Sequence, residues 1–149
     1  MPPLLMTGLL NTHAACTLMM TGLIWMVQLV HYPLFARVGA EGFTRYQREH
    51  TRRITWVVGP LMAAEGLTAL SLLVLGGPSL RGPALAGLAL LAIIWASTAL
   101  LQVPCHERLS QGRDAAILAR LVRTNWIRTA AWSIRGVLAL VMLSGGAAV

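Results

Sequence analysis

Four long apolar segments are the feature of this sequence that most restricts its fold. A helix needs about 20 mainly apolar residues to cross the hydrocarbon core of a bilayer, and each segment meets this requirement. Of the 149 residues, 56% are hydrophobic and only 11% are charged, which is too apolar for a domain whose surface faces water. The predicted spans are 12–36, 54–75, 84–103 and 126–143. We therefore expect an all-α integral membrane protein in which residues 1–149 form a single four-helix bundle.

All twelve basic residues are arginine, and their placement predicts the orientation of the bundle. Most of them lie between the first and second spans and between the third and fourth, whereas the opposite side carries only Arg81. By the positive-inside rule, both arginine-rich segments face the cytoplasm and both termini lie outside. This orientation accounts for the net charge of +7, so we expect no nucleic-acid partner.

A short internal repeat appears when residues 31–53 are aligned with residues 106–128. The alignment places the first predicted span on the third and the second on the fourth, and it pairs His31 with His106 and Arg48 with Arg123. Such a pattern predicts two parallel helical hairpins related by a pseudo-twofold axis along the membrane normal. Symmetric sites would then gather around that axis.

Three histidines and one asparagine, one for each span, form the first candidate site: His31, His50, His106 and Asn125. All four fall near the predicted cytoplasmic ends of the spans. Imidazole is a ligand for iron, copper and zinc, so the three histidines would provide a metal site with an open position. His31 and His106 would equally serve as the axial ligands of a b-type haem. The alternative is that all four are interfacial polar residues, bonded to backbone or to lipid headgroups.

Glu65 and Arg135 are the most deeply placed charges and form the second candidate site. At ~1.5 Å per residue, Glu65 lies roughly 16 Å and Arg135 roughly 14 Å from the cytoplasmic ends of their helices. Charges at matched depth inside a membrane are expensive unless they are paired, which predicts an ion pair between the second and fourth spans. In the functional alternative, Glu65 relays a proton or Arg135 anchors an anionic or quinone-like substrate.

A polar stripe on the fourth span connects these two sites. Asn125, Arg128, Trp132 and Arg135 recur at spacings of three, four and three, which places them on one face of a helix. A polar face inside a bundle indicates a hydrated or ligand-filled cavity, or else hydrogen bonds that join the helices. In the catalytic interpretation, Asn125 and Arg128 orient the substrate or a bound oxyanion, while Glu65 and Arg135 supply or stabilise a proton.

Three segments resemble those of a family of small, uncharacterised bacterial four-span membrane proteins: HYPLF at 31–35, VVGPLM at 57–62 and LVRTNWIRTAAWSIRG at 121–136. In size and span count the chain is also loosely similar to anthrone-oxygenase-like membrane proteins, which oxidise polycyclic phenolic ketones. No specific motif of that second family is present, so no catalytic residue is carried across. The resemblance implies a location in the bacterial inner membrane and favours an oxidase or oxygenase.

These patterns lead to one functional prediction and two alternatives. We predict a small membrane oxidoreductase that holds iron, copper or haem at the histidines and acts on a lipophilic, quinone-like molecule. The first alternative is a non-catalytic subunit of a larger membrane complex. The second is a small transporter or lipid-binding protein. Membrane lipid is an expected contact in each case, and a homodimer is an expected assembly because four helices enclose little volume.

Overall fold

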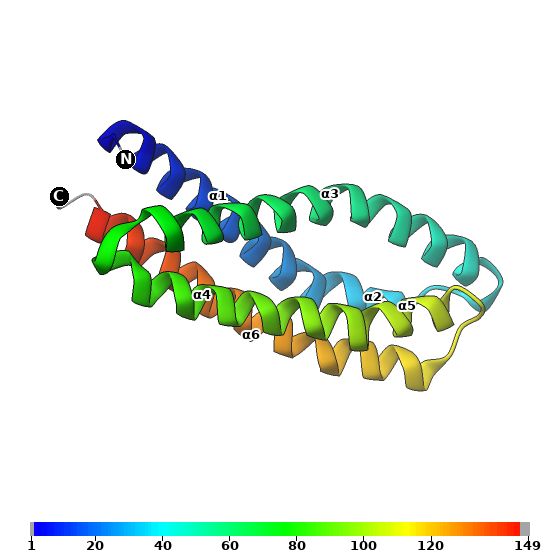
Figure 1. Cartoon of the computed structure of the whole chain (residues 1–149). Coiled ribbons are helices and arrows are strands. Elements are labelled where there is room, and N and C mark those ends of the chain that lie inside the picture. Colours follow the sequence, from blue (N-terminus) through cyan, green and yellow to red (C-terminus); the bar gives the residue numbers. More distant parts are fainter. Residues whose placement is uncertain (1, 147–149) are drawn as a thin grey trace.

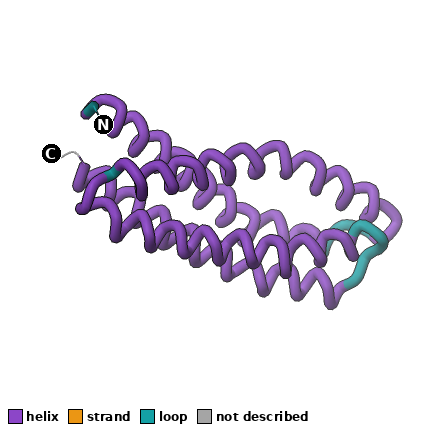
Figure 2. Tube along the Cα trace, viewed as in Figure 1, coloured by secondary structure: helices purple, strands orange, loops and turns teal. Residues whose placement is uncertain are grey.

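The computed structural model describes residues 2–146 and confirms the expected all-helical bundle with four helices long and apolar enough to cross a membrane. The chain therefore has the architecture of a multi-pass membrane protein. Its elements are α1 (Pro3–Met26), η1 (Val27–His31), α2 (Tyr32–Phe35), α3 (Ala40–Leu75), α4 (Gly77–Ser97), η2 (Thr98–Gln102), α5 (Val103–Leu109) and α6 (Ala115–Gly146). Helix α1 continues directly through η1 and α2, and α4 continues through η2 and α5. The chain therefore forms four long helices that run in alternating directions along the bundle. The first and last helices place their free ends at one end of the bundle, and the α2–α3 and α5–α6 connections lie at the other (Figures 1 and 2).

Each helix packs on two neighbours around the bundle. Helix α1 contacts α3 and α6, and α4 contacts the same two helices. Within residues 2–146, the backbones of α1 and α4 do not approach each other, nor do those of α3 and α6, so these pairs stand diagonally opposite. This square arrangement is the one that two parallel hairpins, α1–α3 and α4–α6, produce about a central axis.

The two hairpins also share an irregular turn, which refines the predicted repeat. The π-helical turns η1 and η2 each end two residues before a proline, Pro33 or Pro104. A proline lacks the N–H of the helical ladder and its ring clashes with the carbonyl four residues earlier, so a widened turn before it relieves the conflict. The shared turn aligns Pro33 with Pro104, and four more residues lie between η2 and α6 than between η1 and α3. The predicted alignment of His31 with His106 is therefore wrong for this helix pair.

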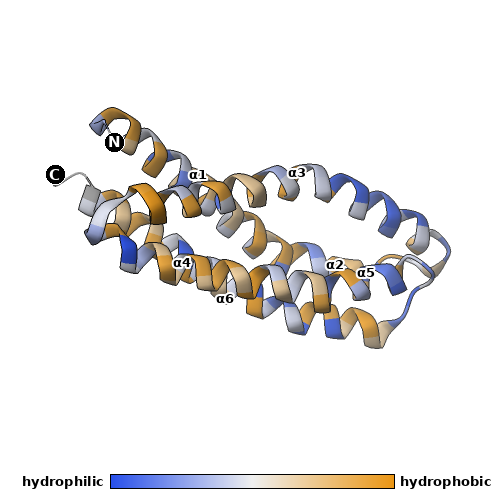
Figure 3. Ribbon diagram, viewed as in Figure 1, coloured by the Kyte–Doolittle hydropathy of each residue, from blue (hydrophilic) through white to orange (hydrophobic). Residues whose placement is uncertain are grey.

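The helices extend well beyond the predicted apolar spans. Helix α3 has 36 residues, a length of about 54 Å, whereas the hydrocarbon core is about 30 Å thick. Its polar first half carries Arg45, Arg48, Arg52 and Arg53 outside the apolar zone (Figure 3). The arginine-rich segments are therefore mostly helix and not long loops, and the connections are only 36–39 and 110–114. An apolar window marks only the part of a helix that lies in lipid.

A single residue, Gly76, separates α3 from α4. Its N–H donates to the carbonyl oxygen of Leu72, and a Cβ on Gly76 would clash with that oxygen. Gly77 follows with φ +72°, a conformation that favours glycine. The third predicted span begins only at residue 84, whereas α4 begins at Gly77 and contains Pro83.

Apolar side chains cover the outside of the bundle as well as its centre. Leu67, Leu100 and Val137 are 68%, 71% and 62% exposed, so large apolar groups face outward where lipid would surround them. Buried aromatic rings fill the interior near the arginine-rich end and include Phe35 and Phe43. Polar groups inside this interior consequently need partners from other helices.

Candidate functional site

The three predicted histidines come together at the arginine-rich end of the bundle. His31 Nε2 and His50 Nδ1 are 2.9 Å apart, and the centroids of the His50 and His106 rings are 5.8 Å apart. His31 is the last residue of η1, the π turn that precedes Pro33. The convergence predicted from the topology is therefore confirmed for the histidines.

Asn125 does not join this group. Its Nδ2 donates to Gln28 Oε1 at 2.9 Å, and Gln28 Nε2 in turn donates to the backbone carbonyl oxygen of Val122 at 3.2 Å. Asn125 and Gln28 are both buried. For Asn125, the alternative that polar groups join the helices by hydrogen bonds is thus the one its contacts favour.

His106 lies in a directed chain of hydrogen bonds. Gln47 Nε2 is 2.8 Å from His106 Nδ1 and also donates to the backbone carbonyl oxygen of His106 at 3.3 Å. Because a carbonyl only accepts, the amide NH₂ of Gln47 faces the ring, and Nδ1 is the acceptor. The proton of His106 is then on Nε2, which donates to the Tyr32 hydroxyl at 3.2 Å. The Tyr32 hydrogen has no acceptor among residues 2–146 and remains available to a further group.

A cavity of about 280 Å³ begins at this chain and runs into the apolar part of the bundle. Its polar end is formed by Tyr32, His50, His106 and Arg128. Toward its other end the lining is mainly apolar, with Leu23, Ile24, Val27, Ile54 and Val58 beside the polar residues Thr98 and Gln102. On the outer side, the exposed residues Thr55, Val103 and Glu107 belong to the lining, so the cavity opens between α3 and α5.

Arg128 brings an unpaired charge to the cavity. The residue is 8% exposed, its Nε has no hydrogen-bond partner, and no carboxylate within residues 2–146 pairs with it. The guanidinium lies beside the Tyr32 hydroxyl, and its Cζ is 5.3 Å from the centroid of the Trp132 ring. The Arg128 guanidinium and the Tyr32 hydroxyl both offer hydrogen-bond donors, so this end of the cavity is suited to an acceptor.

A metal or haem held by His106 would have to replace one of the hydrogen bonds that its ring already makes. Within residues 2–146, no group of three or more His, Cys, Asp or Glu side chains is arranged to hold a metal ion. Both nitrogens of His106 are hydrogen-bonded. The centroid of the His50 ring lies 4.4 Å from that of His31 and 5.8 Å from that of His106, so His50 occupies space that a haem between His31 and His106 would need. Metal or haem binding at His31, His50 and His106 stays a prediction. Glu49, next to His50, pairs with Arg52 and Arg53 at the surface.

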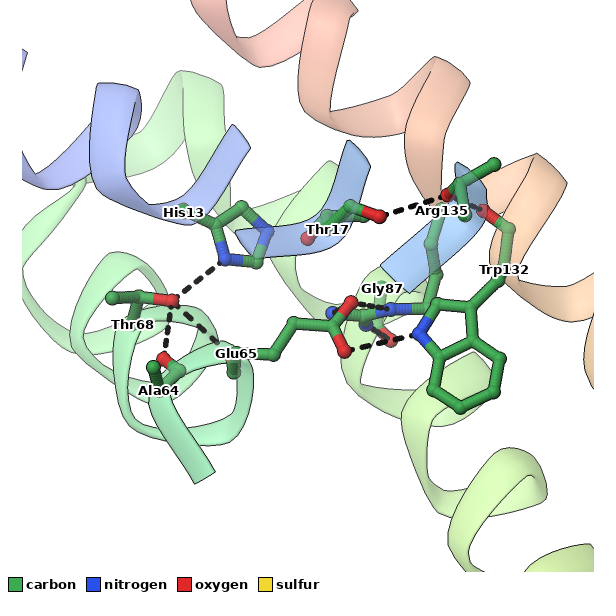
Figure 4. Close-up of polar contacts among 9 residues, drawn as sticks. His13, Thr17, Ala64, Glu65, Thr68, Gly87, Trp132 and Arg135 are labelled. Carbon is green, nitrogen blue, oxygen red and sulfur yellow. Dashed lines mark hydrogen bonds and ion pairs between the residues drawn. The ribbon is translucent and has the colours of Figure 1, made fainter. Parts of the chain in front are cut away.

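The second predicted site is an ion pair that joins the diagonally opposite helices α3 and α6. Arg135 Nε donates to Glu65 Oε1 at 3.0 Å, and Arg135 Nη2 lies 2.9 Å from the same oxygen. Trp132 Nε1 donates to the other oxygen, Oε2, at 3.0 Å, while Arg135 Nη1 donates to the carbonyl of Gly87 on α4 (Figure 4). Glu65 is 0% and Arg135 2% exposed, so the matched depth predicted from the sequence is confirmed as a buried pair. Neither residue lines the cavity, and a catalytic role for them stays a prediction.

His13 extends the polar interior toward the ends of the chain. Its Nδ1 is 2.9 Å from Thr68 Oγ1, and Thr68 uses its own hydrogen toward the carbonyl of Ala64 at 2.8 Å (Figure 4). The Thr68 oxygen must therefore accept, and His13 carries a proton on Nδ1. This fixes the hydrogen-bonding role of His13 as a link between α1 and α3, apart from the three clustered histidines.

Comparisons with known proteins return no relative. No protein-family model, no curated protein and no solved structure matches the chain. The resemblance to four-span and anthrone-oxygenase-like families stays a prediction. The function must be argued from the site itself.

Tyr32 and Gln47 are the functional candidates that sequence reasoning missed. Tyr32 directly follows His31, and Gln47 precedes His50 by three residues, so it shares a helical face with that histidine. These spacings were visible in the sequence. Which polar residue faces His106 was set only by the packing of α3 against α5.

Proposed function

We propose that this protein binds a lipophilic small molecule whose polar end carries hydrogen-bond-accepting oxygens, as in a quinone-like compound. The observation that carries the proposal is the cavity with donors at one end and apolar side chains at the other. A ligand cavity that is mostly apolar with a few convergent polar groups is the usual form of a small-molecule site. We place the protein in the bacterial inner membrane, with the arginine-rich end in the cytoplasm.

The opening between α3 and α5 supports a ligand that partitions into the bilayer. Such a molecule would enter sideways and place its apolar part against Ile54 and Val58. Its oxygen would accept from Tyr32 and Arg128. In this site the chain Gln47 to His106 to Tyr32 holds the hydroxyl in place, and Tyr32 would pass a proton between His106 and the bound group.

Binding of decylbenzoquinone and of laurate to the detergent-purified protein, measured by titration calorimetry, tests the proposal. Val58→Trp fills the apolar end of the cavity and should weaken binding of both probes at least tenfold. Val57→Trp is the matched control, because Val57 is 48% exposed and does not line this cavity. If neither probe binds, or if both variants bind like the wild type, the proposal is wrong.

The convergence of His31, His50 and His106 favours a second candidate, the metal- or haem-dependent oxidoreductase. In this proposal a bound metal or haem would supply the redox chemistry, and the lipophilic substrate would occupy the cavity. The absorption spectrum and the elemental analysis of the purified protein test it. A Soret band or near-stoichiometric iron or copper, lost on replacement of His31 or His50 by alanine, would support it. A metal-free, colourless protein after incubation with metals and haem would exclude it.

A further inference from the structure

We infer that the ligand of the cavity is a lipophilic carboxylate and that its negative charge is the counterion of Arg128. This inference rests on the proposed binding function and adds the charge of the ligand to it. It begins from the difference between two buried arginines of α6. Arg135 has Glu65 as its partner, whereas Arg128 has no carboxylate within residues 2–146.

A buried guanidinium without a counterion is costly in a membrane protein. Charged groups in the spanning region pair with one another or face a water-filled cavity, and they mark ligand or ion sites. Arg128 is 8% exposed, its Nε is unsatisfied, and the Tyr32 hydroxyl and the face of Trp132 lie beside it. The cavity is therefore where a negative group would lower the free energy of this side chain.

The donor set selects a carboxylate over a neutral carbonyl. A carboxylate offers two oxygens that accept several hydrogen bonds, and the planar guanidinium matches it with parallel N–H groups. The Tyr32 hydroxyl, held by His106 Nε2, supplies an additional donor at the same end of the cavity. A quinone oxygen would accept some of these hydrogen bonds but would leave the charge of Arg128 uncompensated.

The cavity volume and its opening fit a carboxylate at the end of an apolar chain. About 280 Å³ is at the lower limit of known ligand pockets, so it holds a head and the first part of a chain. The rest of the chain would pass between α3 and α5 into lipid, beside the exposed Val103.

Three probes of similar apolar length, titrated into the protein in phosphatidylcholine nanodiscs, test the inference: laurate, methyl laurate and decylbenzoquinone. We expect the wild type to bind laurate about tenfold to a hundredfold more tightly than the ester, the size of a charge-assisted hydrogen bond. Arg128→Gln should remove this preference, and Arg128→Lys, which keeps the charge, should retain a smaller one. Arg123→Gln, at an exposed position of the same helix, should bind like the wild type.

The outcomes separate this inference from the proposed function. Equal wild-type affinity for laurate and its ester would overturn the carboxylate assignment while leaving a cavity that binds lipophilic molecules. A preference for laurate that persists in Arg128→Gln would also overturn it. The comparison of laurate with methyl laurate needs only the wild-type protein, so it holds even if a variant fails to fold. Failure of all three probes to bind would refute the proposed function itself.

Discussion

Arg128 and Arg135 lie seven residues apart on one buried face of α6, but only Arg135 has a carboxylate partner within residues 2–146. Seven residues are about two helical turns, or roughly 10 Å, so the two guanidinium groups occupy different levels of the bundle. At the deeper level the protein supplies its own counterion in Glu65. At the level of Arg128 it supplies a cavity instead.

Breaking the buried ion pair should destabilise the protein strongly. Glu65→Gln leaves Arg135 without a charged partner, and removing one member of a buried pair costs about 3 to 5 kcal/mol of the free energy of unfolding. Unfolding by SDS, followed by circular dichroism, measures this change. Glu65→Met combined with Arg135→Met should recover most of the loss. Glu49→Gln, which breaks a surface pair, should leave stability unchanged, and an equal loss in both single variants would contradict the interpretation.

The Tyr32 hydroxyl should contribute to ligand affinity. Tyr32→Phe removes the group that His106 holds toward the cavity, and a hydrogen bond to a charged group is worth about 1.5 to 3 kcal/mol, or at least tenfold in Kd. Calorimetric titration of laurate measures the effect. Tyr46→Phe is the matched control, since Tyr46 is 40% exposed and outside this cavity. Equal affinity in the two variants would argue that the hydroxyl does not face the ligand.

Close approach of α1 and α6 should depend on Gly136. A Cβ at this position would lie 3.2 Å from Thr21 Oγ1, so Gly136→Val forces the helices apart and should cost about 1 to 3 kcal/mol of stability. Gly22→Val tests the same change where nothing lies within 4 Å of the added Cβ. The stabilities of the two variants are compared by unfolding them in SDS. A Gly136→Val protein as stable as Gly22→Val would show that α1 and α6 leave room for a larger side chain at position 136.

The orientation of the bundle can be measured with single cysteines. In a background with Cys16→Ser and Cys105→Ser, we expect Arg81→Cys to react with a membrane-impermeant maleimide on intact bacterial spheroplasts. Gln111→Cys, in the connection at the opposite end, should react only after lysis, because the positive-inside rule places that end in the cytoplasm. The reverse labelling pattern would invert the topology.

The order of residues along the chain was sufficient to predict the four spans and the pairing of Glu65 with Arg135. Both follow from strong, one-dimensional constraints: the bilayer fixes the length of an apolar helix, and a constant rise per residue places the two charges at the same depth. The convergence of the three histidines could be predicted for the same reason, since each lies near the cytoplasmic end of a predicted span. The true ends of the helices could not be predicted in this way, because arginine-rich segments continue a helix beyond the lipid.

Which polar groups face one another depends on how the helices pack. The turns before Pro33 and Pro104 change the direction of the side chains that follow, so the alignment of His31 with His106 did not hold. Asn125 is hydrogen-bonded to Gln28 and not to the histidines, and the partners of His106 are Tyr32 and Gln47. The cavity beside Arg128 likewise exists because α3 and α5 leave space between them. Such contacts depend on the rotation and separation of packed helices, which helical spacing in one chain segment does not specify.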